Sequence, residues 1–158
     1  MTRNGVLIGR VQLIQHVWLN GLDASFITLE GATFNNTTPR GLVSTMLPHI
    51  VVGLSAHSIG TPAGGGITQR MGSVSAIGLT ERIACNYSGL AWTVTNAIRV
   101  NFGVLGGESG GLVYTDVISM GWRESGLIGV IVGSDNVTFT IVSRADNINR
   151  TIGLVIAP

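Results

Sequence analysis

The segment 106–111 reads Gly-Gly-Glu-Ser-Gly-Gly, and its serine, Ser109, has the clearest capacity for chemistry in this sequence. A serine flanked by glycines lies on backbone that can turn sharply and approach a substrate closely. In that geometry, neighbouring backbone N–H groups can converge on the oxyanion of an acyl-transfer intermediate. A glycine-rich hairpin loop with an incidental serine gives the same pattern, so the motif alone leaves both interpretations open.

Metal, redox and phosphate chemistry receive little support from the sequence. Its single cysteine, Cys85, and three scattered histidines lack the spacing of a structural zinc site. There is no lysine, which a Walker-type phosphate loop requires, so the three glycines at 64–66 indicate a turn. We therefore expect no cofactor and no metal.

The composition is that of an apolar chain with few charges. Of 158 residues, 45% are hydrophobic and 11% are charged, against about 25% charged in an ordinary soluble domain. All nine cationic residues are arginines, and eight acidic residues leave a net charge of +1. This balance offers no basic surface of the kind that binds nucleic acid, so we expect no nucleic-acid partner.

The apolar stretches are too short for a membrane helix. The run 126–133 is among the longest, whereas a spanning helix needs about 18 apolar residues. The apolar run 5–9 is followed by Arg10 without a cleavage pattern, so we expect no signal peptide and no membrane span. An excess of Asn-x-Ser/Thr sequons gives mild support to an extracellular or secreted location; they begin at Asn35, Asn36, Asn86, Asn136 and Asn149.

The elements that must position Ser109 are predicted to be β-strands. Short β-rich runs are separated by glycine, asparagine or proline; they cover 6–14, 24–29, 50–55, 67–77, 90–100, 126–132, 137–142 and 152–156. Alternation in 92–100 predicts one buried and one exposed face, as in antiparallel sheets. The pattern predicts an all-β barrel or sandwich. A weak capping box at 143–146 indicates one helix start, and 35–41 reads as a linker.

The serine motif resembles that of the chymotrypsin-like serine proteases, in particular the short bacterial streptogrisin-type branch, whose motif reads Gly-Asp-Ser-Gly-Gly. The runs that begin at Gly72, Asn86, Gly126 and Val137 follow the order and approximate spacing of that family's second barrel. The run 14–29 looks like its aspartate strand. The resemblance implies an all-β, chymotrypsin-like antiparallel fold. Residues 41–158 would form a near-complete second β-barrel, and residues 1–40 the last strands of the first barrel and a linker.

The same resemblance assigns roles to individual residues. It implies that Ser109 is the nucleophile, that Asp23 orients a histidine, and that the amides of Gly107 and Ser109 form the oxyanion hole. The strand that would pair with the substrate backbone consists of Val132, Gly133 and Ser134. In the family, histidine takes the serine proton while the aspartate fixes its tautomer.

The family's catalytic histidine has no counterpart in this sequence. It lies several strands before the aspartate, whereas only 22 residues precede Asp23 here. For His16, His49 and His57 we prefer surface or structural roles in strands. Two further departures are Glu108 in place of the usual aspartate and Val132 in place of a serine.

Three functional hypotheses follow. The chain is a serine endopeptidase, or part of one, completed by a histidine-bearing N-terminal segment or another protein chain. Alternatively, it is an inactive homologue that binds a peptide or protein in the old cleft. In the third hypothesis it is a structural protein that forms a homo-oligomer through apolar strand edges such as 6–14.

Overall fold

In this computed structural model, the structure describes the backbone of residues 2–3, 6–7, 9–15, 24–29, 37–38, 41–46, 49–84, 89–119 and 122–152. Side chains are described within 49–84, 89–117 and 125–150. The account of the site below therefore rests on residues 49–150.

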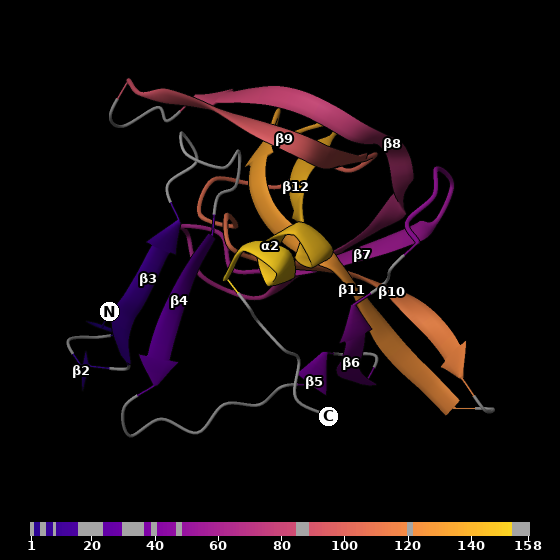
Figure 1. Cartoon of the computed structure of the whole chain (residues 1–158), viewed down its shortest axis with the longest axis horizontal. Helices are drawn as coiled ribbons and strands as arrows, with labels where there is room; N and C mark the ends of the chain where they lie inside the picture. The colour runs from indigo at the N-terminus through magenta and orange to yellow at the C-terminus, as the bar shows by residue number, and fades with distance from the viewer. Residues whose placement is uncertain are drawn as a thin grey trace.

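The centre of the molecule is a closed antiparallel barrel (Figure 1). Its strands are β7 (Ser55–Gly60), β8 (Thr68–Ala84), β9 (Ala91–Val100), β10 (Leu112–Ser119), β11 (Trp122–Ser134) and β12 (Thr140–Arg144). They follow the spatial order β10-β7-β8-β9-β12-β11, and β10 also pairs with β11, which closes the barrel. Closure leaves none of these six strands as a full-length free edge.

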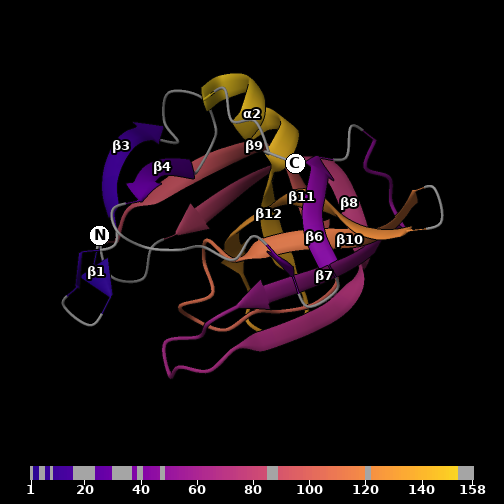
Figure 2. The ribbon, with the colours of Figure 1, turned by 90° about the horizontal axis from the view of Figure 1, so that it is seen from below.

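The remaining strands come from the first part of the chain. They are β1 (Thr2–Arg3), β2 (Val6–Leu7), β3 (Gly9–Gln15), β4 (Ala24–Leu29), β5 (Thr37–Thr38) and β6 (Gly41–Met46). The pairs β1–β2 and β3–β4 each form a separate two-stranded sheet, and both are drawn to one side of the barrel in Figure 2. Strand β6 pairs in parallel with β11, and β5, which lies inside the segment expected to be a linker, pairs with β6.

Two hydrophobic clusters pack on the strands of the barrel. Core cluster 1 contains Ile50, Ala56, Val74, Ile98, Val100, Phe102, Val104, Val113, Ile128, Ile131 and Val142. Core cluster 2 contains Val94, Ala97, Val132 and Ile141. Strand β9 contributes to both clusters, because Asn96 adopts a left-handed φ of 52° and the β8–β9 register shifts nearby. Strict alternation would turn Ala97 outward, whereas the irregularity lets it join Val94 in the core.

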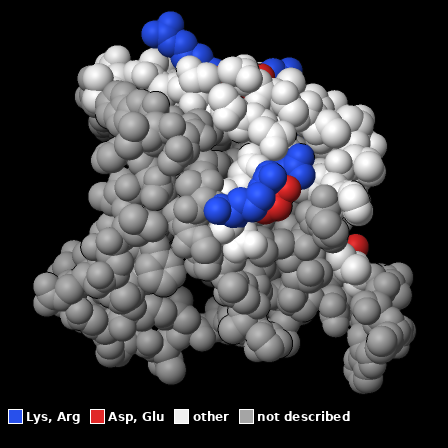
Figure 3. Space-filling model, in the orientation of Figure 1, with Lys and Arg blue, Asp and Glu red and all other residues white. Residues whose placement is uncertain are grey.

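The helix expected near the C-terminus is present as α2 (Ala145–Ile152), which follows β12 directly. It does not begin with a capping box, because Ser143 belongs to β12 and its Oγ is buried without a hydrogen-bond partner. Asp146 instead pairs with Arg144 through two hydrogen bonds of 2.9 and 2.8 Å. In Figure 3 the coloured charges are few, and one blue and red group lies where Figure 1 shows α2.

No helix within the described residues is long and apolar enough to cross a membrane.

Candidate functional site

The serine loop connects β9 to β10 and holds Ser109 at the surface. Within the loop, Glu108 N donates to Leu105 O at 3.2 Å, and Gly111 N donates to Glu108 O at 3.0 Å. Gly110 N donates to Ile131 O at 2.9 Å, which ties the loop to β11. In the described part of the chain, the amides of Gly107 and Ser109 donate no hydrogen bond. Two unengaged N–H groups thus flank the buried Glu108, beside an exposed hydroxyl.

Gly107 occupies a position that no other residue fits. Its φ is +96°, and a Cβ at this position would overlap Ala63 N and lie 3.0 Å from Ala63 Cα. The close approach is held by a hydrogen bond of 2.9 Å from Ala63 N to Gly106 O. Only glycine combines a left-handed backbone with so little space, so the loop conformation is encoded directly at this residue.

Glu108 anchors the serine loop from below. Its side chain is 1% exposed, and its carboxylate accepts hydrogen bonds from Thr68 Oγ1, from Leu105 N at 2.5 Å and from Arg70 at 3.3 Å. Burial alone raises the pKa of Glu108, but the hydrogen bonds from Thr68, Leu105 and Arg70 outweigh it, so the pKa is lowered. The carboxylate is therefore ionised and fully coordinated at neutral pH.

A cleft of about 600 Å³ opens beside Ser109. Its lining comes from the serine loop, the end of β11, the start of β12 and the β8–β9 pair; the residues are Glu81, Arg82, Ile83, Ala84, Trp92, Val104, Leu105, Gly106, Gly107, Ser109, Val132, Gly133, Ser134, Asp135, Asn136, Phe139 and Ile141. The structure therefore brings the expected nucleophile, the expected oxyanion glycine and the expected substrate strand to one concave surface.

The strand residues 132–134 have distinct surroundings. Val132 is buried in core cluster 2, and Gly133 packs against the side chain of Ile83. Ser134 Oγ donates to Phe139 O at 2.8 Å and accepts from Val104 N and Asn136 N, both at 3.0 Å. The Ser134 hydroxyl is thus a structural bridge between the two walls of the cleft.

The turn from β11 to β12 is organised by Asp135. Its Oδ1 accepts hydrogen bonds from the amides of Val137, Thr138 and Phe139 at 3.0, 2.8 and 2.9 Å. The amide of Phe139 and the hydroxyl of Thr138 lead the interactions that lower the pKa of Asp135 far below its usual range. The carboxylate is therefore committed to the turn and stays ionised.

Neither histidine of the described residues lines the cleft: His49 is exposed and His57 is buried in β7. His57 Nε2 lies 3.2 Å from Ser55 Oγ and 3.9 Å from Asp116 Oδ2, and its ring stacks on Tyr114. A Ser-His-Asp triad needs the serine and the aspartate on opposite ring nitrogens, whereas here both face Nε2. His57 is a structural strand histidine, as its sequence context suggested.

Three residues of the sequence-based hypotheses, Asp23, His16 and Cys85, lie outside the described residues. Within the described ranges, no group of three or more metal-binding side chains comes together.

The sequence did not reveal several residues that build the site. Thr68 and Arg70, which bind the Glu108 carboxylate, are two residues apart on β8 and share one face of that strand. They lie 40 and 38 residues from Glu108 along the chain. Ile83 and Trp92 reach the cleft because β8 and β9 are long and arch over the barrel (Figure 1). No local motif marks any of the four.

Comparison with known proteins gives a structural match but no match in sequence. No family model matches the chain. No curated protein matches it. Among solved structures, the MamO protease domain from Magnetospirillum magneticum, in its apo form, superposes with a TM-score of 0.55 at 14% identity. The match covers 94% of this chain and 68% of that domain. Together with the closed antiparallel barrel, this likeness shows that the chain has an all-β, chymotrypsin-like fold.

Proposed function

We propose that this chain binds an extended peptide in the cleft beside Ser109 and that Ser109 is the nucleophile of a serine endopeptidase. The unengaged amides of Gly107 and Ser109 at the mouth of the cleft are the observation that carries the proposal. On motif order, the short bacterial streptogrisin-type enzymes are the branch we favour.

The chemistry is acyl transfer. The Ser109 hydroxyl attacks the carbonyl carbon of the scissile peptide bond, and its proton passes to a base. The oxyanion that forms accepts hydrogen bonds from the amides of Gly107 and Ser109, which cost no reorganisation because no other group among the described residues accepts from them. The C–N bond of the tetrahedral intermediate then breaks as the base returns the proton to the departing amine, and water releases the acyl group from Ser109 in the same manner. Residues 132–134 border the bound peptide at the wall of the cleft.

The base comes from outside the described residues in this proposal. A histidine oriented by Asp23 fits the role, supplied by an N-terminal segment or by another chain. The described histidines are unsuited to it because neither lines the cleft.

The oxyanion amides can be tested by titrating the protein with a short alanine peptide that ends in a free carboxylate. Its carboxylate oxygens stand in for the oxyanion, so the amide resonances of Gly107 and Ser109 should shift in saturable fashion in ¹H–¹⁵N spectra. The same peptide with a C-terminal amide should bind more weakly. Equal affinity for the two peptides, with no shift at these amides, would contradict the proposal.

A matched pair of glycine variants tests whether carboxylate binding depends on the backbone conformation of the serine loop. Gly107→Ala places a Cβ against Ala63 and should abolish carboxylate binding, whereas Gly64→Ala meets nothing within 4 Å and should bind like the wild type. Unfolding curves for both variants show whether lost binding reflects lost structure.

A second candidate function is peptide binding without hydrolysis, which the absence of a described histidine from the cleft favours. Fluorophosphonate labelling distinguishes the two, measured alone and with added imidazole as a replacement base. Labelling of Ser109 under either condition, and none in Ser109→Ala, supports the endopeptidase. No labelling in a protein that still binds the peptide supports the binding protein.

A further inference from the structure

The cleft is narrowed beside Gly133 by the side chain of Ile83, which belongs to β8. Ile83 Cδ1 lies 2.9 Å and Cγ2 lies 3.3 Å from the point where a Cβ on Gly133 would stand. The face of Gly133 is therefore covered by an isoleucine that belongs to a different part of the barrel. The width of the cleft at this point depends on the size of that side chain.

Elsewhere in the lining, segments 102–104 and 134–140 are held together by hydrogen bonds between side-chain hydroxyls and backbone groups. Thr140 Oγ1 donates to Phe102 O at 2.6 Å, and Val104 N donates to Ser134 Oγ at 3.0 Å. Between them, Gly103 is packed so closely on the backbone of Val137 that a Cβ would overlap it. Segments 102–104 and 134–140 are thus joined by direct contacts, whereas Ile83 reaches the cleft from β8 through its side chain alone.

Two of the three charged residues of the lining are engaged within the protein. Glu81 accepts a hydrogen bond of 2.5 Å from Arg99, and Asp135 is committed to its turn. Arg82 also lines the cleft and is exposed, and alternation along β8 places it on the opposite face of the strand from Glu81 and Ile83.

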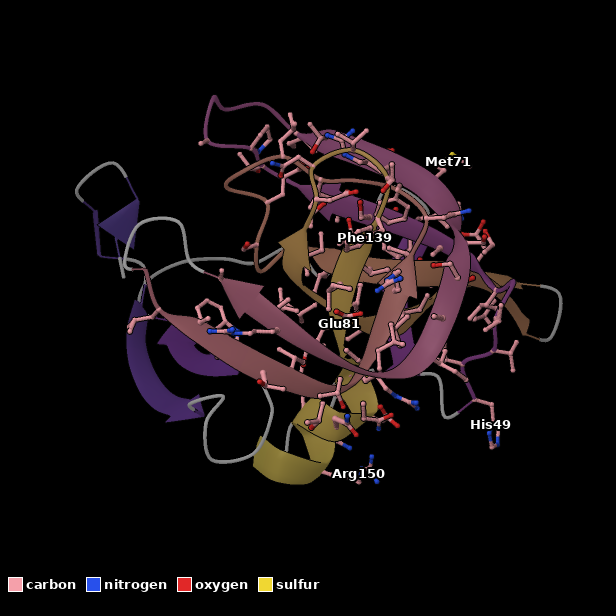
Figure 4. All side chains as sticks on the ribbon, turned by 90° about the horizontal axis from the view of Figure 1, so that it is seen from above. His49, Met71, Glu81, Phe139 and Arg150 are labelled. Atoms are coloured by element: carbon pink, nitrogen blue, oxygen red, sulfur yellow. The ribbon has the colours of Figure 1, made fainter. Side chains whose placement is uncertain are left out.

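The rest of the lining combines apolar side chains, such as those of Ile83 and Phe139, with the polar residues Ser109, Ser134 and Asn136. The guanidinium of Arg99 lies 4.8 Å from the centre of the Phe139 ring, so the same arginine that neutralises Glu81 also packs on Phe139. In Figure 4, the labelled Glu81 and Phe139 lie inside the curve of the β8 ribbon, whereas Met71 lies at its outer edge. The apolar part of this surface favours uncharged side chains, because burying an unpaired charge against apolar groups is unfavourable.

We propose that Ile83 sets the size of the side chain that the cleft accepts, and that the accepted class is aliphatic rather than aromatic or charged. This inference rests on the proposed function, because it takes the ligand to be an extended peptide. Ile83 acts here as a specificity-determining residue through the space it occupies beside Gly133.

The experiment measures affinities of five fluorescent peptides, each with three alanines followed by alanine, valine, phenylalanine, lysine or glutamate as the terminal residue. In the wild type we expect the valine peptide to bind about tenfold more tightly than the phenylalanine, lysine and glutamate peptides, since changes of this size in an apolar pocket alter affinity by about 10-fold or more. In Ile83→Ala the ratio of phenylalanine to valine affinity should rise about tenfold.

Control variants separate the proposed role from stability. Ile77→Ala removes an isoleucine from the same strand that is 41% exposed and does not line the cleft, so the ratio should stay at the wild-type value. Ile83→Val should also raise the ratio of phenylalanine to valine affinity, but by less than Ile83→Ala. This variant keeps the test valid if Ile83→Ala does not fold. Ile83→Phe should weaken binding of every peptide.

The outcomes separate this inference from the proposed function. If no peptide binds the folded wild type, both are overturned. If peptides bind but charged ones bind as tightly as valine, or Ile83→Ala and Ile77→Ala give the same ratio, only the specificity inference is overturned.

Discussion

At the scale of single residues, the serine loop depends on a buried carboxylate rather than on the nucleophile itself. The sequence showed Glu108 where the resemblance expects aspartate, and the structure shows what the longer side chain reaches. Its carboxylate meets Thr68, Arg70 and the amide of Leu105, and Glu108 itself is 1% exposed. The buried charge therefore holds the backbone of the loop at Leu105, before Ser109.

Glu108→Gln should lower the free energy of unfolding by about 2 kcal/mol at pH 7, because it removes a charged acceptor and leaves buried donors poorly paired. The folded-state pKa of Glu108 is lowered, so its contribution is present above its ordinary value of 4.5 and is lost as the pH falls through the folded pKa. Urea unfolding at pH 7 and below pH 4 should therefore show a difference between wild type and variant that shrinks in acid.

Glu81→Gln is the matched control, because the Glu81 carboxylate is also paired with an arginine but is 25% exposed. Glu81→Gln should lower the free energy of unfolding by less than about 1 kcal/mol. If the two variants lose the same free energy of unfolding, the burial of Glu108 does not strengthen its interactions.

At the scale of elements, the cleft depends on how closely β11 and β12 approach each other. Gly129 of β11 pairs with Arg144, and a Cβ on Gly129 would overlap Ser143 O and lie 2.8 Å from Val142 Cγ1. Any side chain at this position forces the two strands apart, and the turn at Asp135 that ends the cleft lies at the far end of the same pair.

Gly129→Ala should destabilise the protein by about 3 kcal/mol through overpacking against backbone. Thermal unfolding followed by circular dichroism measures the loss, with Gly64→Ala as the control that introduces the same methyl group into open space. A Gly129→Ala protein as stable as the control would mean that β11 and β12 are spaced more widely than the structure shows.

At the scale of the whole molecule, closure of the barrel makes its two clusters parts of one cooperative unit. Strands β9, β11 and β12 each contribute to both core cluster 1 and core cluster 2, so neither cluster can open without disturbing the other. A single unfolding transition is expected for the barrel.

Ile98→Ala should lower the free energy of unfolding by about 2–5 kcal/mol, because Ile98 is 0% exposed in core cluster 1. The exposed Ile67, at 74%, provides the control, since Ile67→Ala should change stability by less than about 0.5 kcal/mol. Circular dichroism and tryptophan fluorescence should report the same midpoint in each variant. Separate midpoints would show that the two clusters unfold independently.

Local pattern was sufficient for several elements. The expected strand 24–29 coincides with β4, and 90–100 differs from β9 by one residue. Other strands were misplaced or missed: 50–55 was expected where β7 covers Ser55–Gly60, and β10 was not predicted although it forms a hairpin with β11, whose pairing starts at Ser119 and Trp122. The other neighbour of β10 is β7, which lies more than 50 residues earlier in the chain at the paired positions, as in Tyr114 and His57.

The sequence by itself determined where the serine loop lies, because the glycines at 106–111 mark a tight turn, and Gly107 takes a left-handed φ that favours glycine. It also determined the all-β class through short runs separated by turns. Only the tertiary structure decided what the loop faces. Thr68 and Arg70 hold Glu108, and Ile83 covers Gly133, because β8 is long enough to cross the barrel and meet residues far along the chain. Contacts of that range depend on how the strands pair, which no local pattern of residues specifies.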